Sequence, residues 1–263
     1  MIGFIGAGHM ATALMQGMTN KGLPPSELIA FDVSQARMAA MWDIGVGTAG
    51  SAAELAERAD MVVLAVKPKD TRALLADLNR EVGGLRDVLS IITGWTHAML
   101  EEALPGARGI ARAMPNTPSL IGEGAIAVAS NHTLKPDRFE ALMQALSACG
   151  RVVVVEEGLF DAVTGICGSA PAYVYMFIEA LADAGVRQGL PRDVAYTLAS
   201  QTMVSSGRMV LQTGQHPAAL KDAVCSPGGT TIEAVYALEK GGMRAAVMDA
   251  VDACVKKVKS LVK

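Results

Sequence analysis

The chain has 263 residues, which is enough for one large or two ordinary domains around a sizeable buried core. Hydrophobic residues make up 51% and charged residues 19%, a balance that excludes an intrinsically disordered chain, and no apolar run approaches the roughly 20 residues of a membrane-spanning helix. The formal net charge of −3 provides no positive field for nucleic acid or an anionic membrane, so we expect neither as a partner.

Short apolar runs of β type alternate with helix-like stretches from residue 1 to about residue 155. The predicted strands are residues 1–5, 28–32, 61–66, 88–92, 109–113, 125–129 and 151–155. Helix start signals lie between the strands. For example, Ser51 can serve as an N-cap residue, and the Glu54 side chain can accept a hydrogen bond from the Ser51 amide in return. This alternation is typical of a parallel sheet covered by helices, so we predict a doubly wound α/β domain over residues 1–155.

After about residue 156 the β-type runs stop, and we predict an all-helical domain over residues 156–263. Its apolar-periodic segments, separated by Gly and Pro, are residues 170–184, 191–211, 217–224, 231–238 and 243–261. Residues 172–178 are apolar on nearly every side, and so small a helical region can hardly bury such a helix alone. We therefore predict a homodimer whose two chains share this core; the alternative is an internal helix buried by its own chain.

A glycine-rich segment follows the first predicted strand and opens a predicted helix. Six residues in it fit the G-x-G-x-x-G/A fingerprint of dinucleotide-binding domains: Gly6, Ala7, Gly8, His9, Met10 and Ala11. Gly6 would permit the tight turn, Gly8 the close approach of the diphosphate, and the small Ala11 the packing of helix on strand. A Rossmann-type cofactor site is predicted; a glycine turn in a domain that binds no nucleotide is the alternative.

The end of the second predicted strand bears on which cofactor is bound. Asp32 could accept hydrogen bonds from the ribose hydroxyls of NAD, whereas Ser34 and Arg37 could hold the 2′-phosphate of NADP. Arg37 could equally be an ordinary solvated helix residue. These residues by themselves leave the choice of cofactor open.

Two further loops follow predicted strands, at the sheet edge where ligands bind in such domains. The first loop consists of Ala65, Val66, Lys67 and Pro68. There the proline fixes the turn and the lysine could meet a phosphate or ribose, or could be simply solvated. The second loop consists of Met114, Pro115 and Asn116, whose proline helps to hold it extended. It could present the asparagine amide and the backbone to a nicotinamide, or could be merely structural.

A proline and two glycines interrupt the helical half near residue 228. The residues of interest there are Ser226, Gly228, Gly229, Thr230 and Thr231. We expect Thr230 to open the next helix as the first member of a capping box, so that glycine and first-turn amides point at one small volume. Such a nest binds a carboxylate or phosphate, and the two hydroxyls of Ser226 and Thr231 suit a small acid with a ring nitrogen. The alternative is a well-capped turn between helices.

Other signals of chemistry are weak. The four cysteines are far apart, which argues against disulfides and a zinc site, and no His-Cys-Asp cluster indicates metal or nucleophilic catalysis. Ser169 is expected to cap the buried helix, with Pro171 in its first turn. The N-terminus lacks the features of a signal peptide, so we expect a cytoplasmic protein without a metal.

Taken together, these segments resemble the pyrroline-5-carboxylate reductase family over essentially the whole chain. The resemblance rests on the fingerprint, the loop at residues 65–68, the Arg-Ala-Met-Pro-Asn-Thr-Pro loop at residues 112–118, and the segments 168–173 and 221–234. The last of these is similar to the C-terminal signature of the family. The resemblance implies a Rossmann domain for NADPH, with NADH as the alternative. It also implies a helical domain interleaved with its twin in a homodimer, in some members a decamer, and a site built from both chains.

The resemblance also implies roles for the residues named above. Gly6 to Ala11 and Ser34 would hold the diphosphate and adenosine phosphate, residues 65–68 the ribose region, and residues 114–116 the nicotinamide side. Asp32 departs from what is expected beside a 2′-phosphate.

In the second half, the substrate 1-pyrroline-5-carboxylate would be held by Ser226, Gly228, Gly229, Thr230 and Thr231. Thr231 would orient its imine for reduction to L-proline, the last step of proline biosynthesis. The alternatives are a reductase of another small cyclic imine or of a hydroxyacid, and a non-catalytic dinucleotide-sensing dimer.

Overall fold

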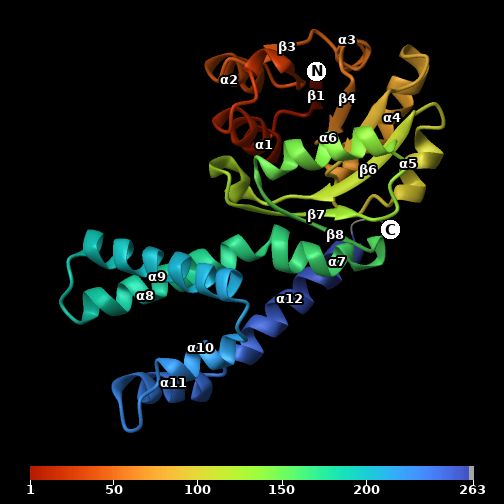
Figure 1. Cartoon of the computed structure of the whole chain (residues 1–263). Helices are drawn as coiled ribbons and strands as arrows, with labels where there is room; N and C mark the ends of the chain where they lie inside the picture. Colours follow the sequence, from red (N-terminus) through yellow and green to blue (C-terminus); the bar gives the residue numbers. More distant parts are fainter. Residues whose placement is uncertain (261–263) are drawn as a thin grey trace. The chain divides into compact units, whose positions relative to one another are not determined.

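The computed structural model describes residues 1–260, and these form two compact units (Figure 1). The first unit comprises Met1–Pro171 and the chain from Ala253 onward, and the second comprises Ala172–Asp252. The division at Pro171 lies later than the domain boundary that the sequence predicts after residue 155. Each unit is described by itself.

An eight-stranded sheet forms the centre of the first unit, in the order β3-β2-β1-β4-β5-β6-β7-β8. The strands are β1 (Ile2–Ile5), β2 (Leu28–Phe31), β3 (Gly47–Thr48), β4 (Met61–Leu64), β5 (Asp87–Ser90), β6 (Gly109–Met114), β7 (Gly124–Ala129) and β8 (Gly150–Val155). All seven predicted strands are present, and the α/β fold class is confirmed. Only β3 was missed, because two residues carry no readable period.

The sheet is not parallel throughout, which corrects the prediction at one edge. Strand β6 pairs with β7 in antiparallel fashion, with Ala113 opposite Val128, whereas all other pairs are parallel. Only residues 115–123 connect β6 to β7. A parallel connection needs a crossover of a dozen or more residues, so this link can only reverse the chain.

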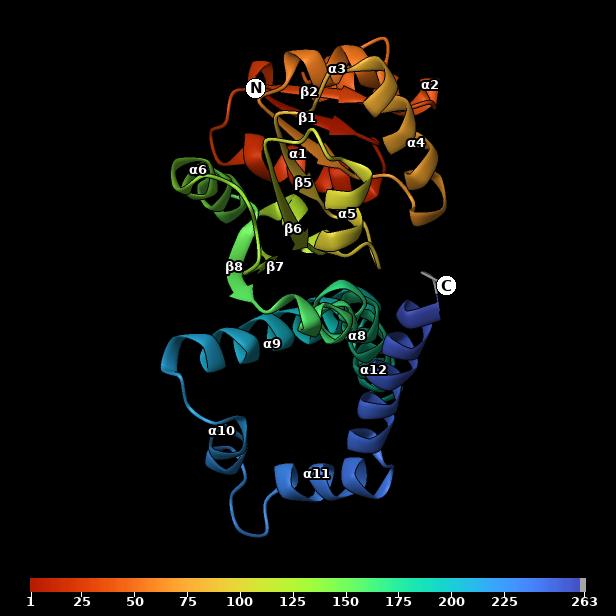
Figure 2. The ribbon, with the colours of Figure 1, turned by 90° about the vertical axis from the view of Figure 1, so that its right-hand side faces the viewer.

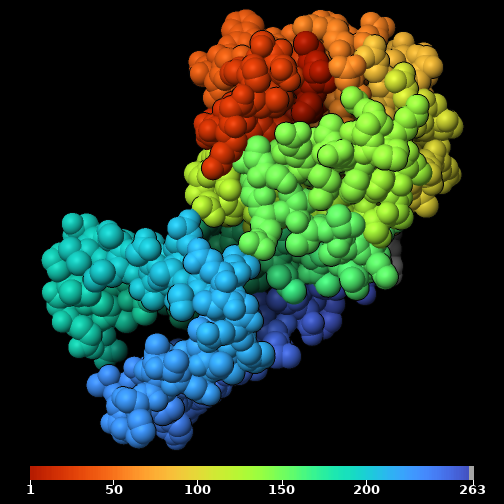
Figure 3. Space-filling view, in the orientation of Figure 1, coloured from red at the N-terminus to blue at the C-terminus, as the bar shows by residue number. Residues whose placement is uncertain are grey.

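Helices cover both faces of the sheet, as the doubly wound prediction requires. Helices α1 (His9–Asn20) and α6 (Pro136–Ser147) bury one core with Phe4, while α3 (Ala52–Arg58), α4 (Pro68–Glu81) and α5 (His97–Ala103) bury another with Ile5. Figure 2 shows α6 and α4 on opposite sides of the sheet. Figure 3 shows the red N-terminal segment beside the green atoms of the α6 region, although the two are far apart in sequence. Helix α2 (Gln35–Asp43) follows β2.

The described chain beyond β8 is helical, as predicted. After a short 3-10 turn, its helices are α7 (Phe160–Val163), α8 (Ala170–Arg187), α9 (Arg192–Thr213), α10 (Pro217–Ala223), α11 (Thr230–Lys240) and α12 (Met243–Ser260). Between α7 and α8 lies a π-helical turn, Thr164–Gly168, which is called the π-turn from here on. The prediction that the last helix reaches Leu261 lies outside the described residues.

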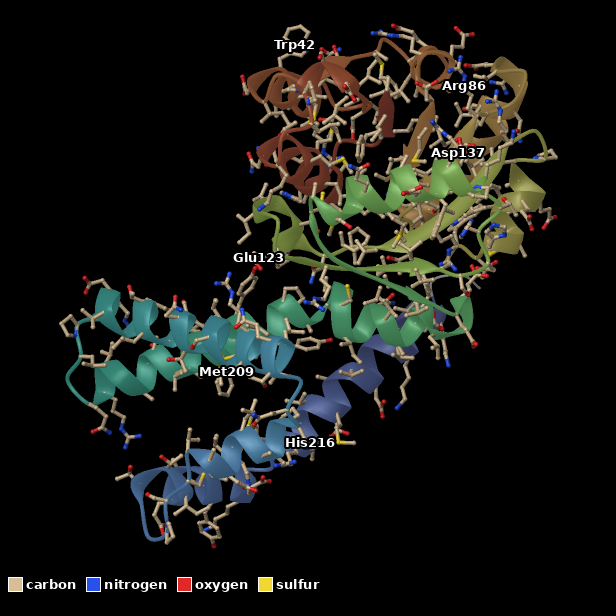
Figure 4. All side chains as sticks on the ribbon, viewed as in Figure 1. Trp42, Arg86, Glu123, Asp137, Met209 and His216 are labelled. Atoms are coloured by element: carbon tan, nitrogen blue, oxygen red, sulfur yellow. The ribbon has the colours of Figure 1, made fainter. Side chains whose placement is uncertain are left out.

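The second unit buries very little of its own surface. Its only core cluster among the described residues consists of the small side chains Ala182, Ala195 and Ala199. Large apolar side chains remain exposed, among them Met176 (69%) and Met209 (49%), the latter labelled in Figure 4. The helices of one chain therefore leave most of their apolar side chains without a core.

Two predicted helix starts have different outcomes. Ser51 Oγ does accept from Glu54 N (3.0 Å), although the Glu54 carboxylate accepts in return from Gly50 N (2.7 Å) rather than from Ser51. The predicted cap at Ser169 is wrong, because the chain is already helical there: Ser169 has φ −98° and ψ −28°, and the helical run extends over Glu157–Arg187. Its hydroxyl instead contacts Cys254 Sγ at 3.1 Å.

Candidate active site

The strand order of the first unit reverses between β1 and β4, and the loops that follow these strands carry the fingerprint and residues 65–68. Ligands of doubly wound sheets bind at such a switch point. Gly6 has φ +99° and donates through its N–H to Phe31 O (2.8 Å). A Cβ on Gly6 would lie 2.7 Å from Ala65 O, so the two loops meet there as closely as backbone atoms allow. Only glycine fits this turn.

Open space lies in front of the first turn of α1. Gly8 is the N-cap residue of α1 and gives the helix no side-chain cap, and a Cβ built on Gly8 would meet nothing within 4 Å. The first intrahelical bond runs from Thr12 N to Gly8 O, so the amides of residues 9–11 are left for a ligand. Free amides, a helix N-terminus and room beside them fit the diphosphate of a dinucleotide. Ala11 is buried against the sheet, as its predicted packing role requires.

The carboxylate of Asp32 is fully engaged within the chain. It accepts hydrogen bonds from Ala7 N (2.8 Å), from Ser34 N (2.8 Å) and from Arg37 Nη1 (3.1 Å), and its side chain is only 6% exposed. Burial alone would raise the pKa of Asp32, but these hydrogen bonds and the charge of Arg37 lower it below its usual value. Asp32 thus ties the fingerprint to the loop after β2.

Ser34 and Lys67 each begin a helix without using their side chains as caps. Ser34 is the N-cap residue of α2 and Lys67 that of α4, and neither shows a side-chain capping bond. Pro68 follows as the first residue of α4, so its predicted role in fixing the turn is consistent with the structure. The hydroxyl of Ser34 and the exposed ammonium of Lys67 therefore stay available at the edge where the fingerprint lies.

Residues 114–116 form a buried loop at the end of β6. Met114 and Asn116 are 6% and 7% exposed. Asn116 Oδ1 accepts from Ala125 N at 2.9 Å, which fastens the loop to the start of β7. The amide oxygen that the sequence offered to a nicotinamide is therefore used inside the protein.

A buried charged cluster stands beside this loop, and the sequence reasoning missed it. Arg112 is an arginine within the otherwise apolar strand β6; its side chain is 5% exposed, it pairs with Glu157, and it stacks over the Phe160 ring at 4.7 Å. The Glu157 carboxylate also accepts from His97 N (2.6 Å) and Asn131 Nδ2 (2.8 Å). The one signal available was a charge in a strand that should be buried on both faces.

The cluster predicts an acid-sensitive contribution to stability. Burial alone would raise the pKa of Glu157, but hydrogen bonds from His97, Arg112 and Asn131 and the charge of Arg112 lower it. A carboxyl whose pKa is lowered by folding stabilises the protein above its unfolded pKa, and this contribution disappears as the pH falls through the folded pKa. We expect Glu157→Gln to lower the free energy of unfolding by about 2 kcal/mol at pH 7, and by less near pH 3.

Urea unfolding at the two pH values measures this difference. The neighbouring Glu156 is exposed, so Glu156→Gln is the matched control, with an expected change below about 0.5 kcal/mol. Equal losses for Glu157→Gln at both pH values would show that the ionised carboxylate is not what stabilises the cluster.

The second unit contains the loop between α10 and α11, which the sequence predicts as a carboxylate nest. Gly228 has φ +67°, Gly229 N donates to Ser226 O (3.0 Å), and a Cβ on Gly229 would lie 2.2 Å from Ser226 Oγ. The Ser226 side chain thus lies directly beside Gly229, and a larger residue than glycine would collide with it.

The predicted capping box at Thr230 is wrong. Gly229 is the N-cap residue of α11, Thr230 is already the first helical residue, and no side chain caps the helix. A threonine with helical backbone cannot turn its hydroxyl onto the amides of the following turn as an N-cap residue does. The first-turn amides of α11 therefore remain free. Within residues 1–260 the Thr231 hydroxyl makes no hydrogen bond, and the residue is half-buried.

No group of three His, Cys, Asp or Glu side chains is arranged to hold a metal ion in the described part of the chain. The site residues of the first unit come from four loops at one sheet edge, and those of the second unit come from one loop between helices. The arrangement in the first unit can bind a dinucleotide, and the uncapped loop in the second can bind a small carboxylate.

Two separate parts of the chain match two family models. Residues 157–261 match the model described as pyrroline-5-carboxylate reductase dimerisation, and residues 1–92 match that of NADP oxidoreductase, coenzyme F420-dependent. The first match begins one residue after the predicted start of the helical half.

Relatives and solved structures are similar over the whole chain. The pyrroline-5-carboxylate reductase of Escherichia coli (strain K12) is 43% identical over 264 residues, covering 100% of this chain and 98% of the relative. That of Glycine max is 40% identical over 262 residues, covering 99% and 95%. The crystal structure of Plasmodium falciparum pyrroline carboxylate reductase with NADP bound superimposes with a TM-score of 0.88 at 34% identity, covering 100% of this chain and 98% of the other.

Proposed function

The chain belongs to the pyrroline-5-carboxylate reductase family, and we infer from this that it transfers hydride from NADPH or NADH to the imine carbon of 1-pyrroline-5-carboxylate, while the ring nitrogen takes up a proton from water, which gives L-proline. Identity of 43% across the entire chain carries the inference. The open space at Gly8 and the uncapped start of α11 support it, because one fits a diphosphate and the other a carboxylate. The reaction is the last step of proline biosynthesis.

The residues of the chain act mainly by binding and orientation. The bound cofactor supplies the hydride. Gly8 and the first-turn amides of α1 hold its diphosphate, and residues 114–116 border its nicotinamide side. The amides from Gly228 to Thr231 hold the substrate carboxylate, which fixes the face of the ring that is reduced. The Thr231 hydroxyl donates to the ring nitrogen, and this polarises the C=N bond for hydride addition.

The environment of Asp32 supports a preference for NADPH. The oxygens of Asp32 are occupied by two backbone amides and Arg37, so they are poorly placed to accept from ribose hydroxyls. Two candidate donors for a 2′-phosphate lie beside Asp32. They are the hydroxyl of Ser34, which makes no capping bond to α2, and the half-exposed guanidinium of Arg37. Asp32 then acts by holding these donors in place.

Replacing Arg37 tests this preference. We expect Arg37→Ala to raise KM for NADPH about tenfold, the effect of one charge-assisted hydrogen bond, and to leave KM for NADH nearly unchanged. Arg58→Ala is the matched control, since Arg58 is a similarly exposed arginine that pairs with Glu54 on α3. Steady-state kinetics with both cofactors measure the effect. Equal increases in KM for NADPH and NADH would contradict the role of Arg37 in binding the 2′-phosphate.

A homodimer with interleaved helices accounts for the exposed apolar side chains of the second unit. The helical run Glu157–Arg187 contains an 18-residue window with a mean hydropathy of 1.2, so by length and composition it could cross a membrane. We propose that a second chain covers it instead, since it falls within the dimerisation match, and that five such dimers can form a decamer. Sedimentation equilibrium should give a mass of two or ten chains.

The proposed surroundings are those of a cytoplasmic enzyme without nucleic-acid or membrane partners. The four cysteines are free thiols in the structure, which fits a reducing compartment: Cys149, Cys167, Cys225 and Cys254. The net charge of −3 supports the lack of a nucleic-acid partner.

The decisive experiment follows the oxidation of NADPH and NADH by absorbance, with the purified protein and 1-pyrroline-5-carboxylate. Turnover with L-proline as product is expected, with the higher kcat/KM for NADPH. Cofactor binding without turnover of this imine would contradict the proposal and favour either another imine or hydroxyacid as substrate or the dinucleotide-sensing dimer.

A further inference from the structure

The π-turn brings Cys167 onto the loop that borders the nicotinamide side. The Cys167 thiol is 2.8 Å from Ala125 O and 3.4 Å from Met114 O, and the residue is 9% exposed. The turn packs closely on this loop, because a Cβ on Gly168 would lie 3.6 Å from Met114 Sδ. Helical π-turns are rare and are frequently found at functional sites. Here the wider turn sets Cys167 against two backbone carbonyls.

The edge of β7 shows what the Cys167 thiol pairs with. The last residue pair between β6 and β7 is Met114 with Ala127, so Ala125 lies beyond the ladder on that side. The N–H and C=O of one strand residue point to the same edge, and at Ala125 no strand of the described chain is paired there. Asn116 Oδ1 accepts from Ala125 N (2.9 Å), and the Cys167 thiol donates to Ala125 O. Two side chains thus continue the ladder where β6 has ended.

We propose that Cys167 is a positioning residue for the reaction: its thiol lies between Met114 O and Ala125 O and fastens the start of the 114–116 loop to β7, beside the bond that Asn116 makes itself, so that the nicotinamide side of the cofactor site keeps one geometry. The proposal rests on the proposed function, since residues 114–116 matter for hydride transfer only if the cofactor binds there. Burial raises the pKa of Cys167 to about 11, so the thiol keeps its proton at neutral pH and can donate.

The contact also joins the two halves of the sequence. The π-turn lies in the segment that matches the dimerisation model, whereas Met114 ends a strand of the sheet. Arg112 makes a second link of the same kind through Glu157 and Phe160. A shift of the helical segment would therefore be transmitted to the loop through the contacts of Cys167 and through the Arg112–Glu157 pair.

The test compares Cys167→Ala and Cys167→Ser with Cys149→Ala. Cys149 is an equally suitable buried thiol, with Sγ 3.3 Å from Leu14 O and a pKa raised by burial to about 12, and in the described part of the chain its thiol makes no hydrogen bond to residues 113–126. Its backbone oxygen does accept from Gly124 N (2.9 Å), but the alanine variant keeps that bond. Two quantities are measured: hydrogen exchange of peptides covering residues 113–126 in the protein without cofactor, and kcat and KM with NADPH.

We expect Cys167→Ala to speed exchange over residues 113–126 and to lower kcat about tenfold, because a small misplacement of reacting groups lowers the rate steeply. KM for NADPH should change less than twofold, since the fingerprint provides most of the binding. Cys167→Ser, which restores a donor, should recover both exchange protection and kcat. Cys149→Ala should lower the melting temperature comparably and leave loop exchange and kcat as in the wild type.

Wild-type exchange and kcat in Cys167→Ala would overturn the positioning role, as would the same losses in Cys149→Ala. These outcomes differ from failure of the proposed function. In that case the wild type itself would not reduce 1-pyrroline-5-carboxylate, and the positioning role would fall with the reaction, even if exchange over the loop still responded to Cys167→Ala.

Discussion

Replacing Thr231 with alanine is expected to lower kcat/KM for 1-pyrroline-5-carboxylate by about 10- to 1000-fold, the range for loss of one hydrogen bond to the transition state. The reason lies at the start of α11. Gly229 is the N-cap residue there, so the threonine hydroxyl is not used for capping and makes no bond within residues 1–260. In the proposed site it is available to the imine nitrogen, whereas the substrate carboxylate would depend on backbone amides that the substitution retains.

The distribution of the effect between kcat and KM is part of the test. A donor that acts on the imine nitrogen as its charge changes should lower kcat more than it raises KM for the substrate. Thr231→Ser keeps the hydroxyl and should retain most of the activity. Thr19→Ala removes a hydroxyl that donates only to Gln16 O in α1, and should leave the kinetics unchanged. Wild-type kcat/KM in Thr231→Ala would remove Thr231 from the mechanism.

Gly8→Asp is expected to weaken NADPH binding at least about 100-fold without unfolding the protein. Gly8 has φ −76° and ψ 178°, an extended conformation open to any residue, and its Cβ would enter empty space. The new carboxylate would point to the place proposed for the diphosphate, and two like charges at about 4 Å repel by several kcal/mol at an intermediate dielectric constant. Titration calorimetry with NADPH measures the change in Kd.

Gly6→Ala is the matched comparison, because Gly6 is required by the backbone turn whereas Gly8 leaves room for the ligand. Gly6 has φ +99°, and its Cβ would lie 2.7 Å from a backbone oxygen, so even alanine should lower the melting temperature by several degrees. Gly8→Ala should melt like the wild type. Tight NADPH binding by Gly8→Asp would mean that the diphosphate does not lie at the start of α1.

The parts of the fold that were predicted are those with a strong local signal. Seven strands and the helices between them have readable periods, and the fingerprint has a fixed spacing, so the α/β half and its cofactor edge were predictable. The direction of β7 was not, because it depends on how few residues connect it to β6 rather than on the strand's own composition.

The missed contacts of the site link residues distant in sequence. Arg112 and Glu157 are 45 residues apart, and Cys167 is 42 residues from Ala125. No spacing rule points to such pairs, and a buried thiol has no sequence signature. The capping box was misread for a different reason: Gly229 and Thr230 are both acceptable N-cap residues, and a one-residue shift decides which hydroxyl remains free.

The hydrogen bonds of Asp32 bear on the choice between NADPH and NADH, which its sequence position leaves open. An acidic residue at the end of the second strand predicts a ribose contact when it is considered alone. In the structure its two oxygens already have three donors, so the same residue supports the opposite cofactor preference.

The three alanines that form the buried cluster of the second unit have a consequence for how the protein reaches its active state. In the proposed dimer the helical half gains its core only by association, so folding of this half is a second-order process in chain concentration. Newly made chains would pass through a monomer with exposed apolar helices, the species most open to chaperones, proteases and aggregation. Expression level, and not only sequence, then sets the fraction of chains that become enzyme.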